Sequence, residues 1–430
     1  MKTPSALIAL VLFVFAGARA QSPESADPIS RPRSVIQARS ASSSKPSVEV
    51  QSGPSQKPSA PVQTGTATSE KITATPKQQP DELATPRDEA VAISHRLSPT
   101  RLRLRISEAE RLMKARPLPT ALTVPSLDYV TLAALLPETS QVHLIRIAKE
   151  TFLTKGSEVS SVTSHGLPVQ IHILRANGVN TAVTIFDGQN RSLLPLVVEF
   201  PIERHGVFRE MAYYTSAHPA LLSPDLVKSG QIYVSAMVDL AAKRLRERGA
   251  PVTQNIINVA KRLCIVEHVD HDRFRNENRI ALFEEIYSLY ALNELDTYRY
   301  SVSSAGAGGM VQMIPWAYQL ERQRHPGVGL NPDFVFGMRN HGNALEAMLL
   351  YMQDTWNDLI ANEDVQSAMT AKQATPTELM AAAYNSNAAK LLGYIRRAGA
   401  GWRTLIPRET QIYLQIYQSL DSLMPVKKHE

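Results

Sequence analysis

The residues best suited to chemistry lie between Glu294 and Pro315, in the segment ELDTYRYSVSSAGAGGMVQMIP. A carboxylate at the end of an apolar segment is followed by a loop of Ser, Ala and Gly residues and then by Gln312. A buried carboxyl group can act as a general acid, and a loop with little side-chain bulk lets a bulky polymer reach the backbone. This combination predicts a site that cleaves a polysaccharide.

The upstream segment NRIALFEEIYSLYALNE predicts a helix that ends near Glu294. Apolar residues recur on one face at three- and four-residue spacing, namely Ile280, Phe283, Tyr287 and Tyr290. Glu294 falls on the same face, where burial and the negative end of the helix dipole would both favour a protonated carboxyl group. We therefore predict Glu294 as the general acid. The competing interpretation is a boundary residue whose carboxylate reaches solvent.

The loop resembles the signature of soluble lytic transglycosylases and goose-type lysozymes. In that family a catalytic Glu precedes a Ser-x-Ala-Gly-Ala-x-Gly loop, which is followed by a Gln and a Pro. Glu294 takes the catalytic position when it is counted back from Ala305-Gly306-Ala307. Further matches to the signature are Ser303, Gly309, Gln312 and Pro315.

Two more segments resemble blocks of the same family, in the expected order. Ala383-Tyr384-Asn385 is similar to its Ala-Tyr-Asn-Ala-Gly block, and Arg408-Glu409-Thr410 with Tyr413 is similar to its Glu-Thr-x-x-Tyr block. The match covers roughly the last 200 residues, about one domain. The resemblance implies Glu294 as the catalytic residue, no metal and no cofactor. It implies substrate contacts from Ser303, Gly309, Gln312, Tyr384, Asn385, Glu409 and Tyr413.

The chain departs from the family pattern at two places, so it resembles a divergent member. Leu295 stands where the family has Ser, and Ser386-Asn387 replace Ala-Gly. The resemblance implies a lyase that cuts the β-1,4 bond between N-acetylmuramic acid and N-acetylglucosamine of peptidoglycan, leaving 1,6-anhydro-muramyl ends. Glu294 would act as acid and then as base. The alternatives are a water-using, lysozyme-like muramidase and a catalytically inactive scaffold that binds the cell wall.

Other groups of polar residues in the chain could also form a site. The run Glu267-His268-Val269-Asp270-His271-Asp272 contains metal-ligand types, but its spacing is not that of a HExxH site and no third ligand is evident. We expect it to be a polar helix end whose histidines line the substrate groove. A two-carboxylate glycosidase would need a second Asp or Glu, for which Asp296 and Glu409 are the candidates. The resemblance implies instead that Glu409 is a structural partner that orients groups near the site.

The N-terminus predicts export from the cytoplasm. Lys2 precedes an apolar run from Ala6 to Ala16 and then Ala18-Arg19-Ala20, as in a cleaved secretory signal peptide over residues 1–20. No Cys follows the run, so we expect no lipid or other membrane anchor. Residues 21–98 are rich in Ser, Pro, Thr, Gln and Lys and predict a disordered linker. The expected location is periplasmic or secreted.

The rest of the chain predicts an α+β fold in two domains. Residues 99–222 contain a short amphipathic helix and then strand-like runs separated by Asn177-Gly178 and Asp187-Gly188, which are hairpin signals. This region is expected to be a small β-rich domain. Residues 223–430 follow a helical pattern and are expected to form a mostly α, lysozyme-like catalytic domain.

Composition limits the partners. The 430 residues carry a net charge of +6 that is spread along the chain, which suits an anionic polymer such as the cell wall. No nucleic-acid-binding motif is present, so nucleic acid is not an expected partner. We expect peptidoglycan glycan strands as partners, and a cell-wall or envelope protein bound through the β-rich domain. Cys264 is the single Cys, so no internal disulfide forms, and its apolar surroundings predict a core position.

Overall fold

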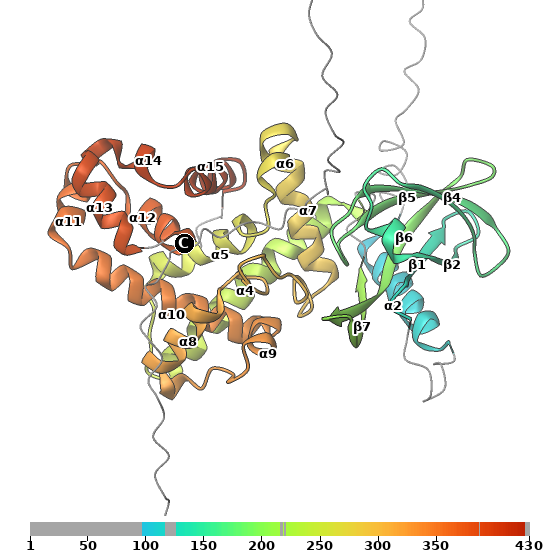
Figure 1. The fold of residues 1–430 in the computed structure, drawn as a ribbon, viewed down its shortest axis with the longest axis horizontal. Helices are drawn as coiled ribbons and strands as arrows, with labels where there is room; N and C mark the ends of the chain where they lie inside the picture. Colours follow the sequence, from blue (N-terminus) through green and yellow to red (C-terminus); the bar gives the residue numbers. More distant parts are fainter. Residues whose placement is uncertain (1–96, 117–125, 216–217, 219–220, 387, 426–430) are drawn as a thin grey trace, which may run out of the picture. The chain divides into compact units, whose positions relative to one another are not determined.

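The structure, a computed structural model, describes residues 97–116, 126–215, 218, 221–386 and 388–425. The predicted signal peptide over residues 1–20 lies outside the described residues, as does the predicted linker except for Leu97 and Ser98. A curled antiparallel sheet comes first in the chain and a helical region follows it (Figure 1). The predicted α+β class is therefore confirmed at this level.

The sheet is built around one long strand. Its strands are β1 (Tyr129–Leu136), β2 (Gln141–Ala148), β3 (Glu158–Val162), β4 (Pro168–Arg175), β5 (Ala182–Asp187), β6 (Ser192–Arg204) and β7 (Val207–Thr215). They pair antiparallel in the order β2-β1-β6-β5-β4-β3, and β7 pairs with β6 as well. Val197 of β6 faces Ala133 of β1 on one side and Thr215 of β7 on the other. The length of β6 lets it pair with three strands, which curls the sheet.

The strand-like runs next to Asn177-Gly178 and Asp187-Gly188 have the sequences VQIHILR, TAVTIFD and LLPLVVEF, and they lie in β4, β5 and β6. The turn between β5 and β6 is fixed by Asp187, whose Oδ1 accepts hydrogen bonds from the backbone N–H groups of Gln189 and Arg191, each at 2.9 Å. Because the Asp187 carboxylate accepts hydrogen bonds from two backbone amides of the turn, it stabilises the turn at this Asp-Gly sequence. The last strand, β7, ends at Thr215.

Helix α2 (Pro99–Lys114) covers part of the sheet. Ser98 caps its first turn, with Oγ accepting from the N–H of Arg101 at 3.4 Å. The apolar face predicted from the sequence is buried, namely Leu102, Ile106, Ala109 and Met113. These residues form one apolar cluster with sheet residues that include Leu135, Val142 and Leu194. An amphipathic helix of this kind is held by its apolar stripe.

The helical region begins at Pro224, and a short α3 (Lys149–Phe152) lies within the strand region. The remaining α-helices are α4 (Pro224–Glu247), α5 (Gln254–Val266), α6 (His271–Asn276), α7 (Arg279–Leu292), α8 (Pro315–Arg324), α9 (Phe334–Arg339), α10 (His341–Ile360), α11 (Glu363–Thr370), α12 (Pro376–Asn385), α13 (Ala388–Ala398), α14 (Trp402–Leu405) and α15 (Arg408–Leu423). Short 3-10 turns occupy Pro326–Val328 and Gly399–Gly401. No helix of the described residues is long and apolar enough to cross a membrane.

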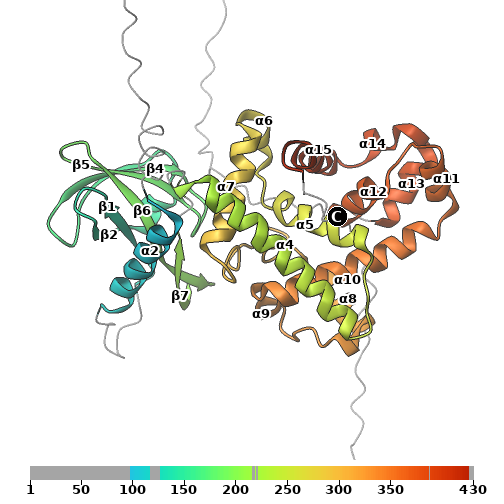
Figure 2. The ribbon, with the colours of Figure 1, turned by 180° about the vertical axis from the view of Figure 1, so that it is seen from behind.

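Helices α4 and α7 pack unusually closely, and Figure 2 shows α4 running across the helical region. A Cβ atom on Gly230 of α4 would lie 1.9 Å from the backbone carbonyl oxygen of Tyr287 in α7, so glycine is required there. Helix α7 is buried around most of its circumference, because Leu282, Phe283, Glu285, Ile286, Tyr287, Ser288, Leu289, Tyr290 and Ala291 are all buried. Cys264 in α5 is fully buried, which confirms its predicted core position.

Candidate active site

A carboxyl group stands at the C-terminal end of α5. This helix is apolar and buried along most of its length, and Glu267 is the residue immediately after its last turn. The Glu267 side chain is half-buried. The hydroxyl of Tyr413 in α15 donates a hydrogen bond to Oε1 of Glu267 at 2.8 Å. A buried helix therefore fixes the backbone of Glu267, and a phenol from a distant helix fixes its carboxyl group.

Glu267 faces a cavity of about 300 Å³. Polar groups from several elements line it, including Glu267, Ser303, Gln312, Asn385, Glu409 and Tyr413. His268 and Tyr298 line it as well, and their rings stack with centroids 3.5 Å apart. A concave site with a few convergent polar groups and an aromatic wall is the usual form of a ligand pocket.

The glycine-rich loop forms one wall of this cavity and is held by its own polar side chains. Oγ of Ser303 accepts a hydrogen bond from the N–H of Ala307 at 3.0 Å. Nε2 of Gln312 donates to the carbonyl oxygen of Gly309 at 2.8 Å and to Oγ of Ser301 at 3.1 Å. Ser303 and Gln312 are both buried, so they act on the shape of the loop as well as on the cavity.

Two neighbouring carbonyl groups tie the loop to the helices behind it. Nε2 of His268 donates to the carbonyl oxygen of Met310 at 2.9 Å, since a carbonyl can only accept. The hydroxyl of Tyr384 in α12 donates to the carbonyl oxygen of Val311 at 2.6 Å. These two hydrogen bonds hold the loop against the end of α5, next to Glu267, and against α12.

Both the backbone conformation of Gly309 and its close packing against α9 require a glycine at this position. Its φ is +68°, and an added Cβ would lie 2.3 Å from the carbonyl oxygen of Met338 in α9. No other residue fits this position without moving the backbone. Gly309 therefore supports the loop and does not itself line the cavity.

The two C-terminal blocks meet beside the cavity. Oγ1 of Thr410 donates to Oδ1 of Asn385 at 2.8 Å, which joins the end of α12 to the first turn of α15. Asn385 and Glu409 line the cavity, whereas Tyr384 is buried behind the loop. The structure thus brings together the predicted residues Ser303, Gln312, Asn385, Glu409 and Tyr413, with Gly309 and Tyr384 as supports.

Glu294 is not in this site, and the expectation that it is buried on a helix face is wrong. Helix α7 ends at Leu292, and Glu294 is exposed and does not line the cavity. Leu295 follows with φ of +68°, so the chain turns sharply after the helix and carries the Glu294 side chain to the surface. Because α7 is buried on nearly all sides, its apolar pattern does not define one face that can be extended to residue 294.

Glu267 is the residue that the sequence reasoning passed over. It satisfies the criterion applied to Glu294, a carboxylate directly after an apolar helix, in IINVAKRLCIV followed by Glu267. Counting back a fixed distance from the glycine-rich loop selected Glu294. Helices α6 and α7 lie between Glu267 and the loop, so a fixed count cannot reach it.

His268 contributes a neutral ring to the site. Burial lowers the pKa of His268 to about 3, so the imidazole carries no charge at neutral pH. Its ring donates a hydrogen bond to the carbonyl oxygen of Met310 and stacks on Tyr298. These contacts suit a polar helix end beside the groove. Asp270 is also occupied, because its Oδ1 caps α6 by accepting from the N–H groups of Asp272 and Arg273.

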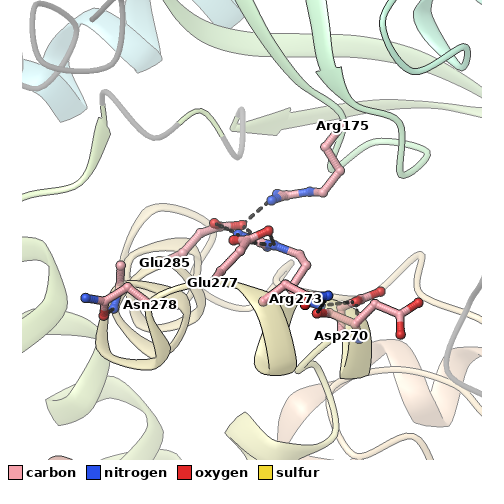
Figure 3. Close-up of polar contacts among 9 residues, drawn as sticks. Arg175, Asp270, Arg273, Glu277, Asn278 and Glu285 are labelled. Carbon is pink, nitrogen blue, oxygen red and sulfur yellow. Dashed lines mark hydrogen bonds and ion pairs between the residues drawn. The ribbon is translucent and has the colours of Figure 1, made fainter. Parts of the chain in front are cut away.

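A buried ionic network lies next to these residues (Figure 3). Arg273 of α6 and Arg175 of β4 both bind the carboxylate of Glu285 in α7, at 2.8 Å and 2.6 Å. Burial disfavours the anion of Glu285, but the two guanidinium groups outweigh it and hold the pKa below its usual value. Glu277 also pairs with Arg273 at 2.8 Å. The network joins β4, α6 and α7 beside the end of α5.

Comparison with known proteins adds no relative. The chain matches no protein-family model, no curated protein and no solved structure. The candidate site is therefore defined by its geometry alone. Glu267 lies at the end of α5 and is oriented by Tyr413, and Glu409 lies in the first turn of α15. The side-chain amides of Gln312 and Asn385 line the same cavity.

Proposed function

We propose that the protein is a peptidoglycan lytic transglycosylase with a lysozyme-like catalytic domain, and that Glu267 is its acid and base. The observation that carries this proposal is the position of Glu267. It lies at the end of a buried helix, bonds to Tyr413 and shares one cavity with Ser303, Gln312 and Asn385. These are the same loop and blocks on which the resemblance to soluble lytic transglycosylases and goose-type lysozymes rests.

The helix termini favour a division of roles between Glu267 and Glu409. The C-terminal end of α5 carries partial negative charge, which favours a protonated carboxyl group on Glu267. Glu409 lies in the first turn of α15, where the partial positive charge favours the carboxylate. Glu267 therefore suits proton donation, and Glu409 suits electrostatic stabilisation of positive charge.

The reaction follows from these roles. The carboxyl group of Glu267 donates its proton to the glycosidic oxygen, and an oxocarbenium-like state develops at C1 of the muramyl sugar. The Glu267 carboxylate, still oriented by Tyr413, then accepts the proton of the muramyl 6-hydroxyl as that oxygen attacks C1. The product is a 1,6-anhydro sugar, and Glu267 returns to its protonated form. General acid–base groups of this type accelerate reactions by roughly 10²- to 10⁴-fold.

A second candidate is a water-using muramidase on the same fold. Glu409 lines the same cavity as Glu267, so a second carboxylate is present that could activate water or stabilise the cation. The location and partners proposed from the sequence, a periplasmic or secreted protein that binds glycan strands and an envelope protein through the β-rich region, apply to both candidates.

The test is mass spectrometry of the fragments that the protein releases from purified peptidoglycan. We expect anhydro-muramyl ends from the wild type, none from Glu267→Gln, and wild-type release from the matched control Glu294→Gln. Reducing ends, one water heavier, would replace the lyase with the muramidase. Loss of activity in Glu294→Gln with retention in Glu267→Gln would reverse the assignment of the acid. Wall binding without any fragment from the wild type would make the protein a scaffold.

A further inference from the structure

A second cluster of ionisable side chains lies between α8 and α10, outside the cavity of the candidate active site. Glu321 of α8 is fully buried, with an exposed fraction of 0 %. Neither of its carboxylate oxygens has a hydrogen-bond partner among the described residues. A buried carboxylate without a partner is costly, so native proteins supply a proton, a cation or a hydrogen-bond donor.

His325 and Asp354 converge on this carboxyl group. His325 follows Glu321 by one helical turn, and its Nε2 lies 3.7 Å from Oε2 of Glu321. Nε2 of His325 lies 3.1 Å from Oδ2 of Asp354, which projects from α10. One ligand atom from each of the three residues lies within 4.8 Å of the other two. A tetrahedral zinc ion with bonds of about 2.1 Å separates its ligand atoms by about 3.4 Å, so these distances fit a single ion.

The donor types select the class of metal. One imidazole nitrogen and two carboxylates form a three-ligand set that suits zinc and related transition metals. Calcium and magnesium prefer sites built from oxygen alone, and the imidazole disfavours them. Arg324 pairs with Asp354 at 3.3 Å from the half-exposed side of the cluster, so it can hold that ligand in place from outside.

The buried surroundings of Glu321 favour a bound cation next to its carboxylate. Glu321 is fully buried, so its carboxylate is removed from water and requires a positive charge nearby. Arg324 reaches Asp354, whereas Glu321 has no ion pair shorter than the 3.7 Å contact to His325.

We infer that Glu321, His325 and Asp354 form a binding site for a divalent transition-metal ion of the zinc class, which fastens α8 to α10. Helix α8 begins at Pro315, three residues after Gln312, so the metal anchors the helix that follows the glycine-rich loop. Glu321 lies in α8, His325 directly follows the last residue of α8, and Asp354 lies in α10. The inference does not depend on the proposed enzymatic activity.

The test uses the untagged full-length protein, freed of metal with a chelator, and titrates it with Zn²⁺ in a calorimeter and with Co²⁺ in a visible absorption experiment. We expect one Zn²⁺ per chain with Kd in the micromolar range or tighter, a Co²⁺ spectrum of a low-symmetry nitrogen and oxygen site, and a rise in Tm on addition of Zn²⁺. His325→Gln and Asp354→Asn should each weaken binding at least tenfold.

Asp358→Asn is the matched control, because Asp358 is exposed one turn further along α10. It should leave Zn²⁺ affinity and Tm unchanged. Circular dichroism of the metal-free variants checks that they remain folded, and Asp354→Asn is mild because that side chain is partly exposed. Absence of stoichiometric Zn²⁺ binding to the wild type would overturn the inference, as would binding that His325→Gln and Asp354→Asn leave intact.

Discussion

The hydroxyl of Tyr413 donates a 2.8 Å hydrogen bond to the carboxylate of Glu267, although the two residues are 146 positions apart in the chain. Tyr413 is almost fully buried, so its phenol has a fixed place in α15. The contact joins the end of α5 to the last helix and sets the direction in which the carboxyl group faces the cavity. Positioning by a rigid neighbour is what a proton donor needs.

Replacing Tyr413 with Phe removes this contact with little change in volume. A hydrogen bond to a neutral carboxyl group is worth about 0.5–1.5 kcal/mol, so we expect kcat for glycan cleavage to fall by roughly 2- to 10-fold. The effect should fall on kcat more than on KM, because the contact orients the acid. Tyr394→Phe is the control, since Tyr394 lies on α13 and does not line the cavity. An unchanged kcat in Tyr413→Phe would remove Tyr413 from the mechanism.

The desolvated ring of His268 should make folding stability depend on pH. Its folded pKa is about 3, whereas an unfolded His has a pKa of about 6.5, so the unfolded chain binds the proton first as the pH falls. The free energy of unfolding should therefore be greatest above about pH 6.5 and fall as acid is added, by about 2 kcal/mol at about pH 5 from this residue alone.

His268→Gln tests this expectation, because Gln can still donate to the carbonyl of Met310. Urea unfolding at about pH 7 and pH 5 should show a smaller loss of stability in His268→Gln than in the wild type. His218 is buried with a similarly low pKa of about 3, so some acid sensitivity should remain in the variant. Equal losses in both proteins would show that His268 is not buried in its neutral form.

The elements that the sequence predicted best have one buried face and one exposed face. Helix α2 buries four residues at helical spacing, and β4 alternates buried and exposed positions over most of its length. Period-2 and period-3.6 patterns arise only when the two faces meet different surroundings. Strand β1 was not predicted: its residues after Tyr129 are buried without alternation, as most of β6 is, but no hairpin signal such as Asp187-Gly188 adjoins it.

The same reason explains why the sequence pattern pointed to Glu294 and not to Glu267. Helix α7 is buried around most of its circumference, so its apolar residues carry no information on where residue 294 would face. Ser303 and Gln312 each make hydrogen bonds within their own loop, so the local sequence encodes the shape of that loop. Asn385 instead contacts Thr410, which is 25 residues away, so its place beside the cavity depends on how α12 and α15 pack. The distance between Glu267 and the loop depends on α6 and α7, which no local pattern fixes.

The buried network around Glu285 should be sensitive to loss of its central carboxylate. Glu285→Gln leaves Arg175 and Arg273 close together without their shared anion, and we expect a loss of about 3–5 kcal/mol in the free energy of unfolding at neutral pH. Glu277→Gln removes a partly exposed partner of Arg273 and should cost less than about 1 kcal/mol. Urea unfolding measures both.

The pH dependence of this network has a defined sign. Because the folded pKa of Glu285 lies below its unfolded value, its contribution is present in full above about pH 4.5 and is lost as the pH falls through the folded pKa. The stability difference between the wild type and Glu285→Gln should therefore shrink in acid below that point. A difference that grows in acid would contradict the ionised state of Glu285.

Gly309 should be the least replaceable residue of the glycine-rich loop. Gly309→Ala introduces a Cβ 2.3 Å from the carbonyl oxygen of Met338 and also places a non-glycine residue at φ of +68°. Gly306 has φ of +77°, but its added Cβ would meet nothing closer than Pro315 at 3.9 Å. Gly306→Ala should therefore cost only the backbone term of about 1–2 kcal/mol, and Gly309→Ala should cost clearly more. Because the clash would push the loop away from α9, Gly309→Ala should also lower glycan cleavage, whereas equal stability of the two variants would show that the loop can move without cost.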